Sequence, residues 1–149
     1  MIPIEVLERL AKVWRAAMER TDLSDVATFY WFPKGSCGDS SLLLEKFLRD
    51  HHIEGCFYVQ GESVPEHPDC RSHAWLEYGD VILDITADQF ACHPGPSVIV
   101  TRDRTWHSHF VEEEREASRI EDYDDFTKDR LLEIYDRVLA AVPPNFLPR

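Results

Sequence analysis

A short stretch in the middle of the chain has the pattern of a β-hairpin. Residues 72–78 (SHAWLEY) and 81–86 (VILDIT) are two runs rich in strand-forming residues, and only Gly79 and Asp80 separate them. A two-residue loop that begins with Gly favours a type II′ turn, which joins antiparallel strands. We therefore predict a hairpin in which Tyr78 pairs with Val81.

This register brings two polar side chains of the hairpin together. Trp75 would lie opposite Asp84, and His73 opposite Thr86. Because side chains alternate along a strand, His73 and Asp84 would project from the same face as diagonal neighbours, with backbones roughly 7 Å apart. A side-chain hydrogen bond can bridge that separation, so the sequence predicts a His73–Asp84 pair.

A cysteine upstream of the hairpin precedes an amphipathic pattern. Apolar residues follow Cys37 at helical spacing between residues 42 and 48, so we expect a helix that begins close to Cys37, with Asp39 or Ser40 as its cap. A thiol at a helix N-terminus meets unpaired N–H groups and the positive end of the dipole, and both favour the thiolate. The same N–H groups could receive an oxyanion.

Cys37, His73 and Asp84 are the three groups that thiol-based acyl chemistry requires. They would be the nucleophile, its base and the residue that orients the base. The predicted reaction begins when the Cys37 thiolate attacks an amide or ester carbonyl and forms a thioester. Water would then give hydrolysis or deamidation, and an amine would give acyl transfer. No cofactor or metal is expected.

This set of motifs resembles the transglutaminase-like branch of the papain-like cysteine enzymes. The matching stretches are residues 35–37 (GSC), the intervening strand 57–62 (FYVQGE), residues 73–77 (HAWLE) and residues 84–86 (DIT). The resemblance covers residues 30–90 and implies an α+β fold, in which an N-terminal helix and the cysteine-bearing helix pack on an antiparallel sheet that carries His73 and Asp84. A C-terminal helix would complete a single domain over residues 1–149.

The chain departs from the family pattern beside the cysteine. Many family members have an aromatic residue there, whereas Ser36 and Gly38 flank Cys37. The oxyanion side chain is therefore unassigned, and the backbone N–H of Cys37 is the default donor. The side-chain candidates for contact with the oxyanion or substrate are Tyr30, Trp31, Gln60, Trp75 and Gln89. Trp75 is also expected to shield the His73–Asp84 bond from water.

Composition limits the partners of this chain. Its 149 residues are 44% hydrophobic, which is enough for one globular domain with a core. The formal net charge of -12 argues against binding to nucleic acid or to an anionic membrane surface. A protein, a peptide or a small amide is the expected substrate, and the sequence does not specify an oligomeric state.

The expected location is the cytoplasm. Acidic residues interrupt residues 1–10 too early for a signal peptide, and no apolar stretch is long enough to span a bilayer. Four cysteines without a close-spaced pair are then expected to be free thiols.

Other segments can be assigned from their patterns. Residues 3–20 and 126–139 have helical spacing of apolar residues, and Pro143 ends the second segment. Residues 98–100 are expected to form a short buried strand. The acidic run 112–114 is expected to open a short helix. Residues 65–69 are expected to form a loop that could border the active site.

Alternative interpretations remain for some of these residues. A zinc site could combine His73 with neighbours such as Cys70 and Cys92, but there is no Cys-x-x-Cys pair, and a metal-bound histidine could not act as a base. His107 and His109 are expected at the surface or near the substrate. The second functional class is a non-catalytic binding domain that keeps the fold.

Overall fold

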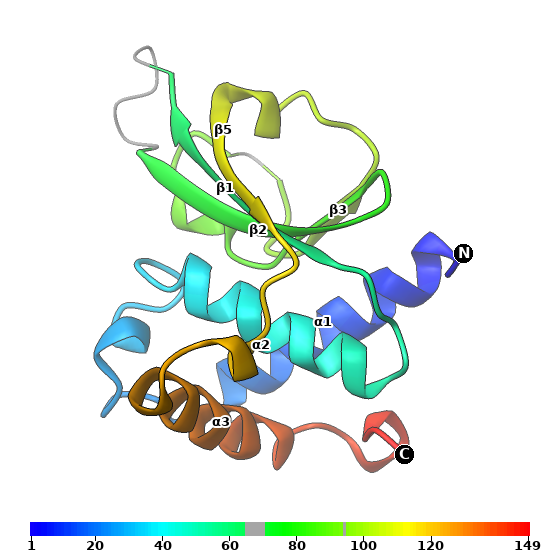
Figure 1. Cartoon of the computed structure of the whole chain (residues 1–149), viewed down its shortest axis with the longest axis vertical. Helices are drawn as coiled ribbons and strands as arrows, with labels where there is room; N and C mark the ends of the chain where they lie inside the picture. The colour runs from blue at the N-terminus through cyan, green and yellow to red at the C-terminus, as the bar shows by residue number, and fades with distance from the viewer. Residues whose placement is uncertain (65–70, 94) are drawn as a thin grey trace.

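The computed structural model describes residues 1–64, 71–93 and 95–149 (Figure 1). Within these residues the chain forms three α-helices and one five-stranded antiparallel sheet, so the fold class is α+β. The strand order is β4-β3-β2-β1-β5. The helices are α1 (Ile4–Arg20), α2 (Cys37–Asp50) and α3 (Asp125–Leu139), and the strands are β1 (Phe57–Ser63), β2 (Ser72–Tyr78), β3 (Val81–Asp84), β4 (Ile99–Thr101) and β5 (Phe110–Glu116).

The three helices lie together on one side of the sheet, where they enclose the larger core (Figure 1). Trp14 of α1 links them, because its ring stacks on Phe47 of α2 at 4.6 Å between centroids and contacts Tyr135 of α3 at 5.1 Å. The helices predicted over residues 3–20 and 126–139 are confirmed as α1 and α3.

The hairpin predicted from residues 72–86 is confirmed, with the predicted register. Tyr78 pairs with Val81, and Leu76 pairs with Leu83. Gly79 has φ +59°, the left-handed value that the first central position of a type II′ turn requires. Because successive side chains point to opposite faces, Leu76 packs into the helical core while Trp75 joins a second cluster.

The second cluster covers the face of the sheet away from the helices. Its members are the apolar residues Val59, Trp75, Ile82, Phe90 and Phe110, with Trp106 packed against them. Two short 3₁₀ segments flank members of this cluster: η2 (Ala87–Gln89) directly precedes Phe90, and η3 (His107–His109) lies between Trp106 and Phe110. This aromatic cluster forms the surroundings of the candidate site.

Two expectations about the later part of the chain need correction. The acidic run Glu112–Glu114 lies inside β5 and does not open a helix, because pairing with β1 decides its conformation and leaves the carboxylates near solvent. The short strand expected over residues 98–100 is β4, shifted by one residue, and its three residues are half-buried.

The prediction that all four cysteines are free thiols is wrong. Cys92 is disulfide-bonded, whereas Cys37 and Cys56 are free. Pairing depends on the distance between two cysteines in the fold, which their spacing in the sequence does not give. Cys70 and the predicted loop at residues 65–69 lie outside the described residues. Among the residues that are described, no helix has both the length and the apolar character to cross a membrane.

Candidate functional site

Cys37 is the first residue of α2 and is half-buried. Ser36, at the N-cap position, makes no side-chain capping hydrogen bond, so the expectation that Asp39 or Ser40 caps the helix is wrong. The Asp39 carboxylate instead accepts hydrogen bonds from Thr28 and Arg130, and the hydroxyl of Ser40 donates to Ser36. The thiol therefore lies at a helix end whose first N–H groups have no side-chain cap at Ser36.

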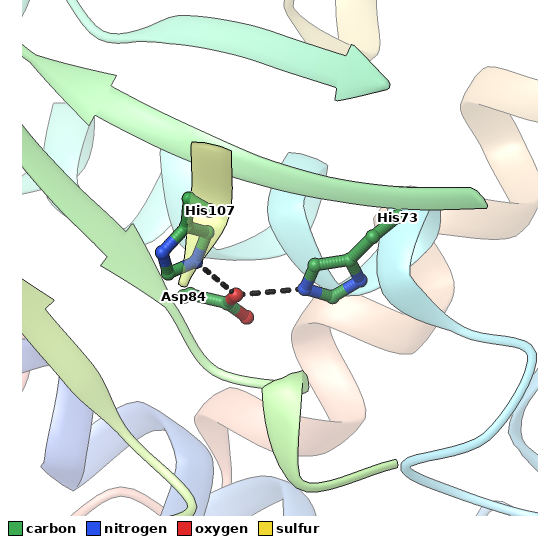
Figure 2. A group of neighbouring side chains, drawn as sticks. All are labelled: His73, Asp84 and His107. Carbon is green, nitrogen blue, oxygen red and sulfur yellow. Dashed lines mark hydrogen bonds and ion pairs between the residues drawn. The ribbon is translucent and has the colours of Figure 1, made fainter. Parts of the chain in front are cut away.

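His73 and Asp84 form the hydrogen bond that the hairpin register predicts. His73 is the second residue of β2 and Asp84 is the last residue of β3. The His73 Nε2 to Asp84 Oδ2 distance is 2.7 Å, and neither side chain is exposed (Figure 2). The second carboxylate oxygen, Oδ1, accepts the backbone N–H of Thr86 at 3.0 Å. Asp84 is therefore held at both oxygens.

The pair perturbs both pKa values in opposite directions. Burial alone would lower the pKa of His73, but the charge and hydrogen bond of Asp84, with a contribution from Cys37, raise it to about 9. Burial alone would raise the pKa of Asp84, yet the His73 charge and the hydrogen bonds from His107 and His73 hold it well below its usual range. The carboxylate is therefore ionised over the physiological range, as an orienting residue must be.

The Cys37 side chain lies close enough to His73 to contribute to the raised pKa of the imidazole. Because Nε2 is directed at Asp84, Nδ1 is the ring nitrogen that remains for other partners. The Gln89 amide nitrogen lies 3.3 Å from the same Nδ1 and donates to the Thr86 carbonyl at 3.1 Å. Of the side-chain candidates for the oxyanion, Gln89 is thus brought beside the imidazole.

Sequence reasoning missed one member of this cluster. His107 was expected at the surface or near the substrate, but it is 4% exposed, and its Nε2 lies 2.7 Å from the Asp84 Oδ2 that His73 also contacts (Figure 2). A histidine 23 positions from Asp84, beyond two further elements, leaves no local pattern that would reveal this contact. The connection between β4 and β5 brings it there, because these strands form opposite edges of the sheet and the segment that includes η3 must cross between them.

Aromatic rings and an ion-pair network surround the cluster. Trp75 is 3% exposed, and its ring centroid lies 5.7 Å from that of His73, which agrees with the expected shielding role. Its indole N–H donates to Glu77 at 2.9 Å. Glu77 is also bound by Arg104 at 2.7 Å and by Arg115 at 2.9 Å, so its buried carboxylate is ion-paired through both oxygens.

The remaining candidates, Tyr30, Trp31 and Gln60, make contacts with other side chains. Tyr30 and Trp31 are 60% and 72% exposed and pack against each other, with ring centroids 4.8 Å apart. Gln60 accepts a long hydrogen bond of 3.4 Å from the Tyr58 hydroxyl. That hydroxyl lies close to Gly38, where an added Cβ would approach it to 3.1 Å. The Tyr58 side chain therefore lies between Gln60 and the start of α2.

The segment after Asp84 is anchored to α1 by Arg15. Its guanidinium donates to the Ile85 carbonyl at 2.6 Å and to both carboxylate oxygens of Asp88 at 2.8 and 2.9 Å. Asp88 is therefore paired, and a substrate contact from its carboxylate would have to displace Arg15. The anchor holds η2, and with it Gln89, against the helical layer.

His73, Asp84 and His107 also have the donor atoms that a metal ion takes. One ligand atom from each lies within 4.8 Å of the others, and all three residues are buried. A tetrahedral ion with bonds of about 2.0 to 2.2 Å would separate its ligand atoms by more than 3 Å. The two contacts of 2.7 Å are hydrogen-bond distances. The geometry therefore fits hydrogen bonding better than coordination.

Comparisons with protein-family models, with curated proteins and with solved structures find no match for this chain.

Proposed function

We propose that this chain is a thiol-dependent acyl hydrolase or acyltransferase that acts through a Cys37–His73–Asp84 triad on a papain-like, transglutaminase-like fold. The observation that carries the proposal is the orientation of one ring. His73 donates through Nε2 to a buried, ionised Asp84 at 2.7 Å, and the Cys37 side chain is close enough to contribute to the raised pKa of the same imidazole. A triad requires this chain of contacts from carboxylate to imidazole to nucleophile.

Each step of the reaction uses an atom of this cluster. The Cys37 thiolate attacks the carbonyl carbon, and His73 donates its Nδ1 proton to the departing amine or alcohol as the bond to carbon breaks. The product is a thioester on Cys37. His73 then takes a proton from water or an amine, which attacks the thioester carbonyl and releases Cys37. Asp84 stabilises the imidazolium and stays ionised throughout.

Two groups can stabilise the negative oxygen formed by each attack. The backbone N–H of Cys37, at the start of α2, is the default donor. The Gln89 amide, which lies beside His73 Nδ1, is the side-chain candidate with the shortest contact to the triad. The substrate classes that this chemistry serves are peptides, glutamine-type side-chain amides and small amides or esters.

Alkylation tests the proposal directly, because Cys37 and Cys56 are both free thiols. Iodoacetamide labelling is followed by mass spectrometry between pH 5 and 10, and the rates at Cys37 and Cys56 are compared in the same sample. We expect Cys37 to be labelled rapidly near pH 6. Cys56 is 5% exposed, and burial, with a small effect of Glu45, raises its pKa to about 12, so it should remain unlabelled. Slow labelling of Cys37 below pH 8 would favour a non-catalytic binding domain.

A metal-binding role is the second candidate, and the grouping of His73, Asp84 and His107 favours it. Elemental analysis of purified protein tests it. A stoichiometric transition metal that is lost in a His107→Ala variant would replace the triad interpretation, since a histidine coordinated through Nε2 loses its bond to Asp84.

A further inference from the structure

We propose that His107 is a positioning residue, which acts through Asp84 to hold the His73 imidazole in its working orientation. The inference deepens the proposed function and rests on it. His107 does not contact the thiol in this arrangement. Its effect passes through one shared oxygen atom, Asp84 Oδ2, which both histidines contact at 2.7 Å.

Asp84 accepts three hydrogen bonds from three separate parts of the chain. Thr86, in the segment after β3, binds Oδ1 at 3.0 Å, whereas His73 of β2 and His107 of η3 both bind Oδ2. The two rings approach Oδ2 from opposite sides (Figure 2). A carboxylate with donors at both oxygens cannot rotate without breaking a bond, so His107 fixes the position of the oxygen that His73 uses.

The sharing of Asp84 Oδ2 also determines which ring nitrogen of neutral His73 carries the proton. An ionised carboxylate has only acceptor atoms, so each imidazole must donate its Nε2–H to Oδ2. In neutral His73 the Nδ1 atom is then the lone-pair nitrogen, which is the tautomer that can take the thiol proton from Cys37. The second hydrogen bond from His107 keeps Asp84 ionised, because it lowers the pKa of that carboxyl.

His107 is itself held rigidly enough to serve this purpose. Its ring makes edge contacts with Trp75 and Trp106, each at 4.9 Å between centroids, and it lies 6.4 Å from the His73 ring. The side chain is 3% exposed. It also borders a cavity of about 330 Å³ whose lining includes Trp106 and Val100 but neither Cys37 nor His73. The ring contacts and the burial therefore restrict the movement of the His107 side chain.

Two substitutions at position 107 separate positioning from packing. In His107→Gln the amide nitrogen lies three bonds from Cβ, as Nε2 of histidine does, so its N–H can still donate to Asp84. His107→Asn carries the same amide one bond shorter, so it cannot reach Asp84 Oδ2. His109→Gln, on the same 3₁₀ segment, is the matched control. All are compared with wild type by iodoacetamide labelling of Cys37 at pH 6 and by proton NMR of the imidazole N–H signals.

We expect His107→Asn to slow Cys37 labelling about 10- to 100-fold, the effect of losing a hydrogen bond to a charged group. His107→Gln and His109→Gln should stay within about threefold of wild type. The wild type should show two downfield N–H signals, from Nε2 of His73 and of His107. The His73 signal should persist in His107→Gln and be lost to solvent exchange in His107→Asn.

The NMR result decides the inference separately from the proposed function. A His73 signal of unchanged intensity in folded His107→Asn overturns the positioning role, as does a wild-type spectrum with only one such signal. If His107→Asn fails to fold, two results still test the positioning role: the number of downfield signals in the wild-type spectrum and the rate of Cys37 labelling in His107→Gln. Slow labelling of Cys37 in the wild type would refute the thiol chemistry, and both downfield signals would still support the contact between His107 and Asp84.

Discussion

Asp84 Oδ2 lies 2.7 Å from His73 Nε2, although the two residues are not partners in the strand ladder. Pairing between β2 and β3 extends from Tyr78–Val81 to Leu76–Leu83, and Asp84 itself pairs with Ile99 of β4. The hydrogen bond therefore spans the diagonal between strands, at the point where β3 ends. From there the chain turns back, so that Gln89 reaches the other side of the same ring.

Asp84→Asn should abolish most activity while the hairpin remains. An amide in place of the carboxylate no longer compels His73 to donate through Nε2, and the same change in a Ser-His-Asp triad lowers kcat about 10⁴-fold. The measurement is turnover of any amide or ester that the wild type cleaves, with near-UV circular dichroism as the control for fold. A loss below tenfold would mean that Asp84 does not orient the base.

Cys37→Ala should remove all acyl chemistry with little effect on stability, because the thiol is half-buried at a helix end. Cys56→Ala is the matched control. It removes a buried sulfur from the helical core at a cost of roughly 1 kcal/mol but leaves activity in place. Turnover and urea denaturation of both variants are compared with wild type. If activity survives in Cys37→Ala, another residue must be the nucleophile.

The parts of the site that lie close in sequence could be predicted, and the parts that come together only in the fold could not. The Gly79 turn and strand alternation were sufficient to pair His73 with Asp84, because a hairpin register is set locally. The surface position considered for His107 was wrong, because its contact with Asp84 depends on the path between β4 and β5, which lie at opposite edges of the sheet. The acidic run in β5 was misassigned because pairing with β1 overrides the local preference.

Stability should depend on pH through the His73–Asp84 pair. The pKa of His73 is raised to about 9, so its contribution is complete below about pH 6.5, the unfolded value, and is lost as pH rises through 9. The pKa of Asp84 is lowered, so its contribution is present above about pH 4 and is lost on further acidification. Urea denaturation from pH 5 to 10 should show a decline above pH 7. If the free energy of unfolding of Asp84→Asn declines equally above pH 7, the His73–Asp84 pair is not the cause of the pH dependence.

Gly61→Ala should destabilise the sheet beside the site. Gly61 pairs with His73 on one side and with Glu112 on the other, next to a register shift in β5. An added Cβ would lie 2.8 Å from the Val111 carbonyl oxygen and 3.0 Å from the Phe110 Cβ. Since backbone must move to admit the methyl group, we expect a loss of about 1–3 kcal/mol in the free energy of unfolding. Thermal denaturation measures it, and an unchanged midpoint would show that β5 moves freely.

Arg15→Lys should weaken the site from a distance. The guanidinium binds the carbonyl of Ile85, directly after Asp84, and both oxygens of Asp88, directly before Gln89. A lysine ammonium is a point charge that cannot reproduce this planar, forked geometry. Because Arg15 is 7% exposed, we expect a loss of roughly 1–3 kcal/mol in the free energy of unfolding.

Arg20→Lys on the same helix is the control for Arg15→Lys. The side chain of Arg20 makes an exposed hydrogen bond to the Ala141 carbonyl, so its replacement should change stability by less than about 0.5 kcal/mol. The two variants are compared by urea denaturation and by the rate of Cys37 labelling at pH 6. Arg15→Lys should lower both the free energy of unfolding and the rate of Cys37 labelling, because the segment that follows Asp84 and carries Gln89 loses its anchor to α1. Equal effects of the two substitutions would show that this segment holds its place without Arg15.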